Sequence, residues 1–179
     1  MNCITELKTN EFQKAEPLSV REEELRQAIE LLFFAYRDFT GEADAILDDY
    51  DFGRAHHRVI YFIGRNPEIT VTQLLAILKI TKQSLSRVLS QLIDEGFIEQ
   101  VTDSQDRRRR LLALTLKGSE LDARLTKRQS HRISAAFKAA GPEAIEGFRQ
   151  ILRGIINEED RERVDGFFDD RSLNSSEAK

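Results

Sequence analysis

The sequence predicts a mainly α-helical protein with one small β-hairpin, an α+β fold. Three observations support this fold class. Apolar residues recur at helical spacing over much of the 179 residues, a very tight turn separates two short helices, and two short β-prone segments flank a charged loop. A chain of this length is sufficient for one hydrophobic core. We therefore expect a single domain at 21–170, between flexible tails at 1–20 and 171–179.

The first two helices follow from apolar periodicity and glycine positions. An apolar stripe over 25–39 predicts a helix at about 22–41, which Gly41 is expected to end. After Phe52 and Gly53, a second helix is expected from Arg54 to about residue 63. The residues at 64–67, Gly-Arg-Asn-Pro, supply a left-handed stop and a proline that cannot continue the helix.

Two threonines predict where the next helices begin. Thr70 and Gln73 have the spacing of a capping box, in which side chain and backbone satisfy each other, and this predicts a short helix at 71–78. Thr81 can cap a further helix that runs to about Glu95, which leaves only residues 79–80 between the two helices. Two short helices joined by so tight a turn are typical of a helix-turn-helix.

A β-hairpin with a charged tip follows Gly96. Residues 97–102 and 111–115 are β-prone, and the loop 103–110 is polar. The hairpin predicts a wing, so that a winged helix-turn-helix covers about 54–115. Thr115 can cap a long helix, and a last helix carries an apolar stripe at 145–156. Because this stripe and that at 25–39 lie at opposite ends of the chain, we expect N- and C-terminal dimerisation helices at about 22–41 and 116–168.

The distribution of charge favours a nucleic-acid partner. The chain has 27 basic and 31 acidic residues, a net charge of -4. Between Lys79 and Lys117, however, eight basic residues face five acidic ones. A basic patch on an otherwise acidic protein can bind phosphate while the remaining surface limits non-specific contact. The predicted partner is double-stranded DNA.

The helix after Thr81 and the wing supply the candidate DNA contacts. Gln83 and Arg87 can each make bidentate contacts to base edges in the major groove. An arginine at the hairpin tip fits the narrow minor groove of A/T-rich DNA, and Asp106 can orient one such arginine. A solvated helix face and a loose phosphate-binding loop are the plainer interpretations, which the neighbouring elements disfavour. The predicted DNA contacts are Thr81, Lys82, Gln83, Ser84, Ser86, Arg87, Ser90, Asp106, Arg107, Arg108, Arg109 and Arg110.

The wing also carries a family pattern. The pattern Asp-Pro-x-Asp-Arg-Arg, followed by a strand that ends Leu-Thr-x-x-Gly, is met by Asp103, Asp106, Arg107, Arg108, Leu114, Thr115 and Gly118, with Ser104 in place of the proline. With the helices before it, this span resembles the MarR family of bacterial regulators, and the resemblance covers about residues 25–168. It implies a triangular homodimer whose first and last helices interlock. It also implies DNA binding that small phenolic or carboxylate ligands, oxidants or metals often change.

A ligand pocket is expected between the dimer helices and the DNA-reading lobe. Aromatic walls with a few basic groups suit a planar anion such as an aromatic acid effector. The alternative is that the aromatic residues form dimer core and the basic residues face water. The residues predicted to line the pocket are Tyr36, Arg37, Phe39, His56, His57, Arg58 and Tyr61.

Other functional classes find less support. The sequence has no glycine-rich phosphate loop and no nucleophile motif, so we expect no enzyme and no cofactor. Adjacent histidines project about 100° apart on a helix, so His56 and His57 cannot share one metal ion, and no metal site is predicted. A redox-responsive regulator, with Cys3 as its only thiol, a metal-responsive one, and a winged-helix protein-interaction module remain alternatives. The longest apolar run, at 31–36, is far shorter than the roughly twenty residues of a membrane span, and the N-terminus lacks signal-peptide character, so a cytoplasmic protein without membrane contact is expected.

Overall fold

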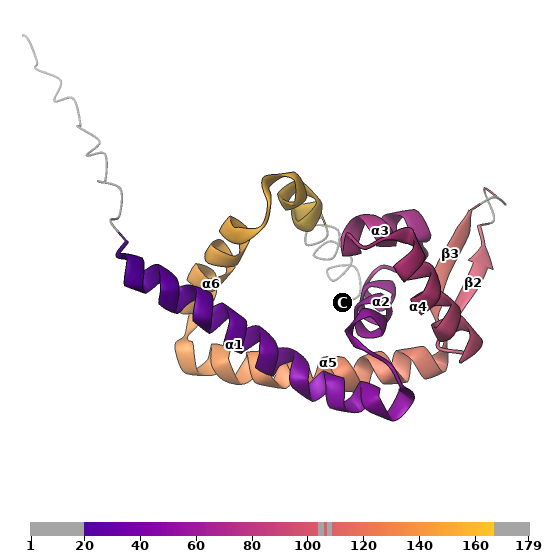
Figure 1. Ribbon diagram of the computed structural model, residues 1–179, viewed down its shortest axis with the longest axis horizontal. Coiled ribbons are helices and arrows are strands. Elements are labelled where there is room, and N and C mark those ends of the chain that lie inside the picture. The colour runs from indigo at the N-terminus through magenta and orange to yellow at the C-terminus, as the bar shows by residue number, and fades with distance from the viewer. Residues whose placement is uncertain (1–19, 104–105, 107–108, 167–179) are drawn as a thin grey trace, which may run out of the picture. The chain divides into compact units, whose positions relative to one another are not determined.

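The structure, a computed structural model, describes residues 20–103, 106 and 109–166 (Figure 1). The expected tails, apart from Val20, and Cys3 lie outside these residues. The chain divides into two compact units, residues 1–38 and 39–179. The elements are α1 (Glu22–Leu47), the 3₁₀ turn η1 (Asp48–Tyr50), α2 (Arg54–Arg65), β1 (Ile69–Thr70), α3 (Val71–Leu78), α4 (Lys82–Asp94), β2 (Ile98–Thr102), β3 (Arg110–Leu114), α5 (Leu116–Ala140) and α6 (Pro142–Ile155), with a further helical stretch at 158–166.

The first helix is longer than the sequence predicts, because Gly41 does not end it. Thr40, Ala43 and Leu47 are buried, and their spacing keeps one face of α1 against the core of the second unit. Burial of this face outweighs the roughly 1 kcal/mol by which a helical glycine is less favourable than alanine. The predicted helix end at Gly41 is therefore wrong.

The second helix begins at the predicted residue, but it ends through a side-chain hydrogen bond and not through a left-handed residue at its end. The N–H of Gly53 donates to Nδ1 of His56 at 3.0 Å, which caps the start of α2. At its other end, Asn66 has a φ of -136°, and its Nδ2 donates to the carbonyl of Phe62 at 2.7 Å. The left-handed residue is instead Glu68, with a φ of 65°.

The two helices of the helix-turn-helix begin at the predicted threonines. Oγ1 of Thr70 accepts from the N–H of Gln73 at 3.2 Å, and Oε1 of Gln73 accepts from the N–H of Thr70 at 2.9 Å. Oγ1 of Thr81 accepts from the N–H of Ser84 at 3.1 Å. Between the helices, Lys79 adopts a left-handed φ of 50° and its N–H donates to the carbonyl of Leu75. Both predicted caps and the tight turn are confirmed.

The wing belongs to a three-stranded antiparallel sheet with the order β1-β3-β2. The β2–β3 hairpin is predicted by the sequence, and Thr102 pairs with Arg110 where the loop joins the two strands. The pairing of Ile69 with Leu112, which adds β1, is not predicted. Two residues are too few to show strand alternation.

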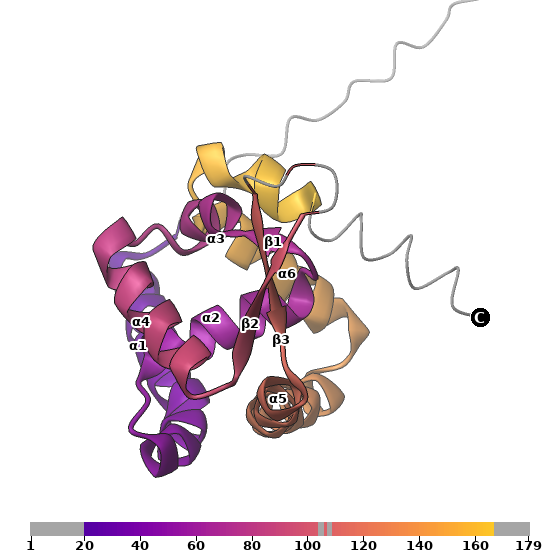
Figure 2. The same cartoon turned by 90° about the vertical axis from the view of Figure 1, so that its right-hand side faces the viewer.

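The core of the second unit lies where α2, α3 and α4 meet the sheet and the start of α5. Figure 2 shows the β2–β3 hairpin beside α4, with α5 below it. The largest fully buried side chains come from these elements, from the end of α1 and from the connection before β2: Leu47, Val59, Ile60, Ile63, Leu74, Leu85, Leu92, Phe97, Ile98, Leu112, Leu121 and Leu125.

Thr115 and Gly118 join the wing to α5. Oγ1 of Thr115 donates to the carbonyl of Gly96 at 2.7 Å and accepts from the N–H of Gly118 at 3.1 Å. A Cβ on Gly118 would lie 2.1 Å from the carbonyl oxygen of Phe97, so only glycine permits this approach. The Leu-Thr-x-x-Gly pattern is therefore a structural junction.

The last helices follow the prediction closely. Gly141, with a φ of 84°, separates α5 from α6. The rings of Phe137 and Phe148 meet edge to face across this corner, with centroids 5.9 Å apart. None of the helices in the described part of the chain combines the length and apolar character that crossing a bilayer requires.

Candidate nucleic-acid interface

The fourth helix has an apolar face and a polar face. Leu85, Val88, Leu89 and Leu92 are buried in the core. The opposite face is exposed and lines one shallow hollow of ≈ 620 Å³. The structure thus brings five of the predicted DNA-contacting residues together, namely Lys82, Gln83, Ser86, Arg87 and Ser90.

The two basic residues on this face, Lys82 and Arg87, keep their positive charges exposed. Neither Lys82 nor Arg87 forms an ion pair with any residue that the structure describes. Lys82 also lies in the first turn of α4, where the helix dipole adds positive potential. This surface is therefore suited to bind a polyanion.

Thr81 and Ser84 are placed differently from the other predicted contacts. Their hydroxyls lie 2.8 Å apart, and Oγ1 of Thr81 also accepts from the N–H of Ser84. Both side chains therefore take part in starting α4. Their predicted role in DNA contact stays a prediction.

Two basic residues in the stretch from 79 to 117 are engaged within the protein. Nζ of Lys79 lies 2.7 Å from Oε1 of Glu159 and 2.7 Å from Oδ2 of Asp160. These hydrogen bonds, first to Asp160 and then to Glu159, raise the pKa of Lys79 above its ordinary value. Nζ of Lys117 donates to the carbonyl of Glu95 at 2.8 Å and lies 3.9 Å from the ring centroid of Phe97. Counting charges along the sequence overstates the cationic surface by including Lys79, whose charge two carboxylates compensate, whereas Lys117 contacts only neutral groups among the described residues.

The structure describes two of the four successive arginines, Arg109 at the end of the loop and Arg110 at the start of β3. Nη1 of Arg109 lies 3.4 Å from Oδ2 of Asp103. The backbone N–H of Asp103 also donates to the carbonyl of Arg109 at 3.2 Å. The guanidinium of Arg110 donates to Oγ1 of its cross-strand partner Thr102. The N–H of Arg109 also donates to the carbonyl of Asp106 at 2.9 Å. Arg107 and Arg108 lie outside the described residues.

Arginine pairing by Asp103 is a role that the sequence analysis missed. Asp103 is buried, and its carboxylate faces Arg109 across the base of the loop. The sequence prediction gave the orienting role to Asp106. The first aspartate of the family pattern was the available indication, because it marks the position where the loop leaves β2.

The predicted pocket residues fall in both units. In the first unit, Tyr36 and Arg37 are exposed, and the Arg37 guanidinium pairs with Asp38 at 2.8 Å and lies 4.9 Å from the ring centroid of Phe34. In the second unit, Phe39 and Tyr61 are half-buried and Arg58 is exposed. The pocket itself stays a prediction.

Both histidines of α2 are built into the second unit. The His56 ring stacks on Phe52 with centroids 4.7 Å apart, and its Nδ1 accepts from Gly53. Its Nε2 therefore carries the proton, which it donates to Oε1 of Gln91 at 2.9 Å. His57 is buried, and burial lowers its pKa, an effect opposed by Asp44 and reinforced by Arg58. No periodicity in the sequence indicates the link from His56 to α4.

A metal ion at these histidines would need further ligand side chains close by. Among the described residues, no three His, Cys, Asp or Glu side chains gather closely enough to hold a metal ion. The ring nitrogens of His56 are already hydrogen-bonded within the protein. A structural role for His56 therefore accounts for its position.

Comparisons with known proteins support the same fold. The MarR family profile matches residues 50–109. The HTH-type transcriptional regulator PetP of Rhodobacter capsulatus is 51% identical over 140 residues, which covers 78% of this chain and 84% of PetP. A mutant MarR from E. coli in complex with operator DNA superposes with a TM-score of 0.57 at 19% identity, over 78% of this chain and 100% of that one. NadR in complex with 4-hydroxyphenylacetate gives a TM-score of 0.56 at 22% identity, over 79% and 95% of the two chains.

The extent of the match with PetP decides the family. It includes the helix-turn-helix, the wing and much of the flanking helices, and its identity is far above that of the structural neighbours. With its paired short helices, its wing and the exposed polar face of α4, the chain belongs to the MarR family of transcriptional regulators and is not an enzyme.

Proposed function

We propose that this protein is a repressor that binds a palindromic operator as a homodimer, with α4 of each protomer in the major groove. The observation that carries the proposal is the outward face of α4, where basic and hydrogen-bonding side chains surround one hollow and neither Lys82 nor Arg87 has an ion-pair partner within the described part of the chain. Two such helices related by a two-fold axis enter successive grooves, so the half-sites lie about one helical turn apart. A dimer that occupies the operator in this way obstructs transcription of the adjacent gene.

We expect α4 and the wing to contact different grooves of the operator DNA. Gln83 and Arg87 read base edges, and Lys82 neutralises a phosphate. Arg109 and Arg110 already have partners within the hairpin. We therefore assign the minor-groove contact to Arg107 and Arg108, with Arg108 entering at the outer flank of each half-site.

The test is a fluorescence anisotropy titration with DNA from upstream of the protein's own coding region. Arg87→Ala is expected to weaken binding to the specific duplex by roughly 1–3 kcal/mol and to relax preference at one base pair. Arg149→Ala, an exposed arginine of α6, is the matched control and leaves the affinity unchanged. An equal loss on specific and random duplexes assigns Arg87 to a phosphate, and no loss on either contradicts reading by α4.

The homodimer is supported by apolar side chains on α1 and α6. Ile29, Phe33, Ile151 and Ile155 are among the exposed large apolar residues of the two helices. Such surfaces favour association with another apolar face. Sedimentation at micromolar concentration is expected to show a dimer, and a stable monomer contradicts the proposal.

Regulation by an aromatic acid completes the proposed function. NadR, which has this fold, binds 4-hydroxyphenylacetate. In this chain the predicted site is defined by aromatic residues and by Arg37 and Arg58. A ligand that favours the DNA-free state must itself bind more weakly to the operator complex. Calorimetry with salicylate is expected to show tighter binding to free protein, and equal affinity for both states contradicts this mode of regulation.

A further inference from the structure

A second pocket lies between the C-terminal part of α1 and the middle of α5. Its volume is ≈ 540 Å³, within the range of about 300–1,000 Å³ that small-molecule sites occupy. All of its residues belong to the second unit. Glu42 and Ile46 line it from α1, and Arg124, Lys127, Arg128 and His131 line it from α5.

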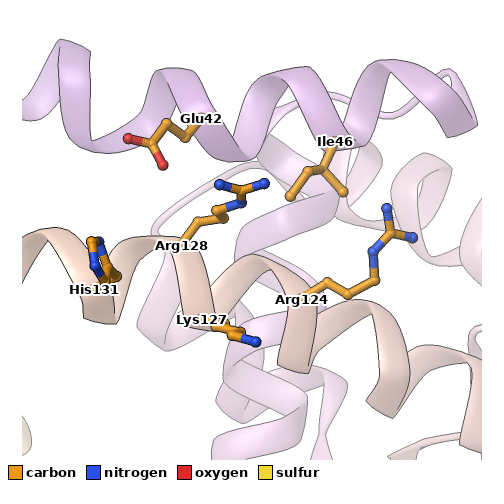
Figure 3. A pocket seen from close by; sticks show the side chains of 6 residues that line it. All are labelled: Glu42, Ile46, Arg124, Lys127, Arg128 and His131. Carbon is orange, nitrogen blue, oxygen red and sulfur yellow. The ribbon is translucent and has the colours of Figure 1, made fainter.

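The four α5 residues form one basic face of the helix. Arg124 and Arg128 are four positions apart, as are Lys127 and His131, so each pair lies along one side of α5, and the two sides adjoin. Figure 3 shows Arg124 and Arg128 extending toward α1, with Ile46 coming down between them. Basic groups and an apolar wall therefore line the same space.

The basic side chains of this face have no acidic partner among the residues that the structure describes. Within the part of the chain that the structure describes, Lys127, Arg128 and His131 have no hydrogen-bond or ion-pair partner. Arg124 donates to the hydroxyl of Tyr50 at 2.8 Å, a neutral partner. Among the described residues that line the pocket, Glu42 is the one carboxylate, and it pairs at 2.6 Å with Arg132.

Such a cluster is unfavourable without a ligand. Like charges three or four residues apart destabilise a helix by about 0.2–0.5 kcal/mol a pair, and the chain as a whole is acidic. A recessed site also concentrates the field of its charges and raises the local concentration of anions. Arginine matches planar oxyanions with paired hydrogen bonds.

We propose that this pocket binds a small oxyanion with at least two negative charges, either a phosphate compound or a polycarboxylate. The multiple charge matches several uncompensated cations, and Ile46 gives a carbon skeleton an apolar contact. The site shares no residue with the outward face of α4 or with the predicted aromatic-acid pocket. It is therefore independent of the proposed DNA readout.

Calorimetry on the full chain tests the site with pyrophosphate and citrate, and with acetate at matched ionic strength as the singly charged control. We expect saturable binding of pyrophosphate or citrate with one ion per protomer, and the preferred ion identifies the source of the oxyanion. The double variant Lys127→Gln/Arg128→Gln is expected to weaken this binding at least tenfold. The control Lys138→Gln/Arg149→Gln removes the same charge from exposed positions outside the pocket and preserves binding.

Four results overturn the proposal. They are the absence of saturable binding of both multivalent ions at millimolar concentration, acetate binding as tight as theirs, an equal loss in the control variant, and unchanged ion binding in the pocket variant. If the pocket variant instead weakens DNA binding and flattens its salt dependence with ion binding unchanged, the basic face contacts DNA. Circular dichroism verifies that both variants remain folded.

Discussion

The winged lobe, built from α2, α3, α4, the sheet and the start of α5, and the terminal helices α1 and α6 use apolar residues in opposite ways. In the lobe, Ile60, Leu74 and Leu112 are completely buried. In contrast, Ile29 on α1 is 69% exposed and Ile151 on α6 is 65% exposed. Burying one such side chain is worth about 1.5–3 kcal/mol. The lobe obtains this stabilisation within one chain, whereas the terminal helices leave it available for association with another surface.

Replacing Gly118 is expected to have the largest effect, because it acts on the core junction of the lobe. In Gly118→Ala, the new Cβ would lie 2.1 Å from the carbonyl oxygen of Phe97, a backbone atom that cannot rotate away. The wing and α5 must separate, which lowers the free energy of unfolding by about 3 kcal/mol or more. Urea denaturation measures this loss.

Gly41→Ala is the matched control for this substitution. Gly41 is also helical and exposed, and a Cβ there would meet no atom within 4 Å. Alanine at this position is expected to be neutral or to stabilise by up to about 1 kcal/mol. A stable Gly118→Ala protein would show that the lobe tolerates a wider junction than the structure indicates.

If the protein forms the proposed dimer through α6, a charge on the apolar face of this helix is expected to dissociate that dimer but leave the lobe folded. Ile151→Asp replaces an exposed apolar side chain with a carboxylate whose burial at an interface is strongly unfavourable. Dimer affinity should fall by about a hundredfold or more, since the change removes about 1.5–3 kcal/mol of apolar burial and adds a desolvation penalty. Sedimentation and thermal unfolding measure the two effects separately.

Gln150→Asp, at the neighbouring exposed position of α6, is the control for this variant. It introduces the same carboxylate away from the large apolar side chains and should preserve the dimer. If Ile151→Asp remains a dimer, α6 does not form the interface. If it unfolds the lobe, the two regions are more dependent on each other than their burial suggests.

The same contrast explains which parts of the fold the sequence predicts. Thr70, Thr81 and Thr115 place three helix starts correctly, because capping depends on residues within one turn. The extension of α1 beyond Gly41 and the pairing of Ile69 with Leu112 depend on contacts distant in sequence. Local chemistry therefore predicts where elements begin, and tertiary packing decides how far they extend.

The candidate DNA interface is likewise predictable from the sequence only where it depends on residues close together in the chain. Helical spacing alone predicts that Gln83 and Arg87 share the outward face of α4. The engagement of Lys79 by Glu159 and Asp160 and the link between His56 and Gln91 join residues far apart in the chain. Composition indicates that charges are present, but only the structure shows which of them are already paired.

The buried histidine of α2 predicts a pH dependence for the stability of the lobe. Burial lowers the pKa of His57 in the folded protein, more than Asp44 raises it, and Arg58 lowers it further. The unfolded chain therefore binds the proton more readily, so this contribution to stability is complete above the unfolded pKa of about 6.5 and is lost as the pH falls below it. The midpoint of urea unfolding should decrease as the pH falls from about 7 to 5.

The size of this decrease should depend on His57 and not on histidine content. His57→Gln is expected to flatten the pH profile, whatever its effect on absolute stability. His131→Gln changes an exposed histidine and should leave the profile unchanged. A profile that is unaltered in His57→Gln would assign the acid sensitivity to other groups.

The smallest expected effect distinguishes two lysines that flank the turn of the helix-turn-helix. Lys82 has no ion-pair partner among the described residues, whereas Lys79 contacts both Glu159 and Asp160 of the C-terminal helical stretch. If Lys82 neutralises a phosphate, Lys82→Gln reduces the slope of log affinity against log salt by about 0.9. Lys79→Gln should change the slope much less, because its charge is already compensated. An equal reduction in both variants would show that Glu159 and Asp160 release Lys79 when DNA binds. In that case Glu159→Gln/Asp160→Asn should strengthen DNA binding, but only while Lys79 is present.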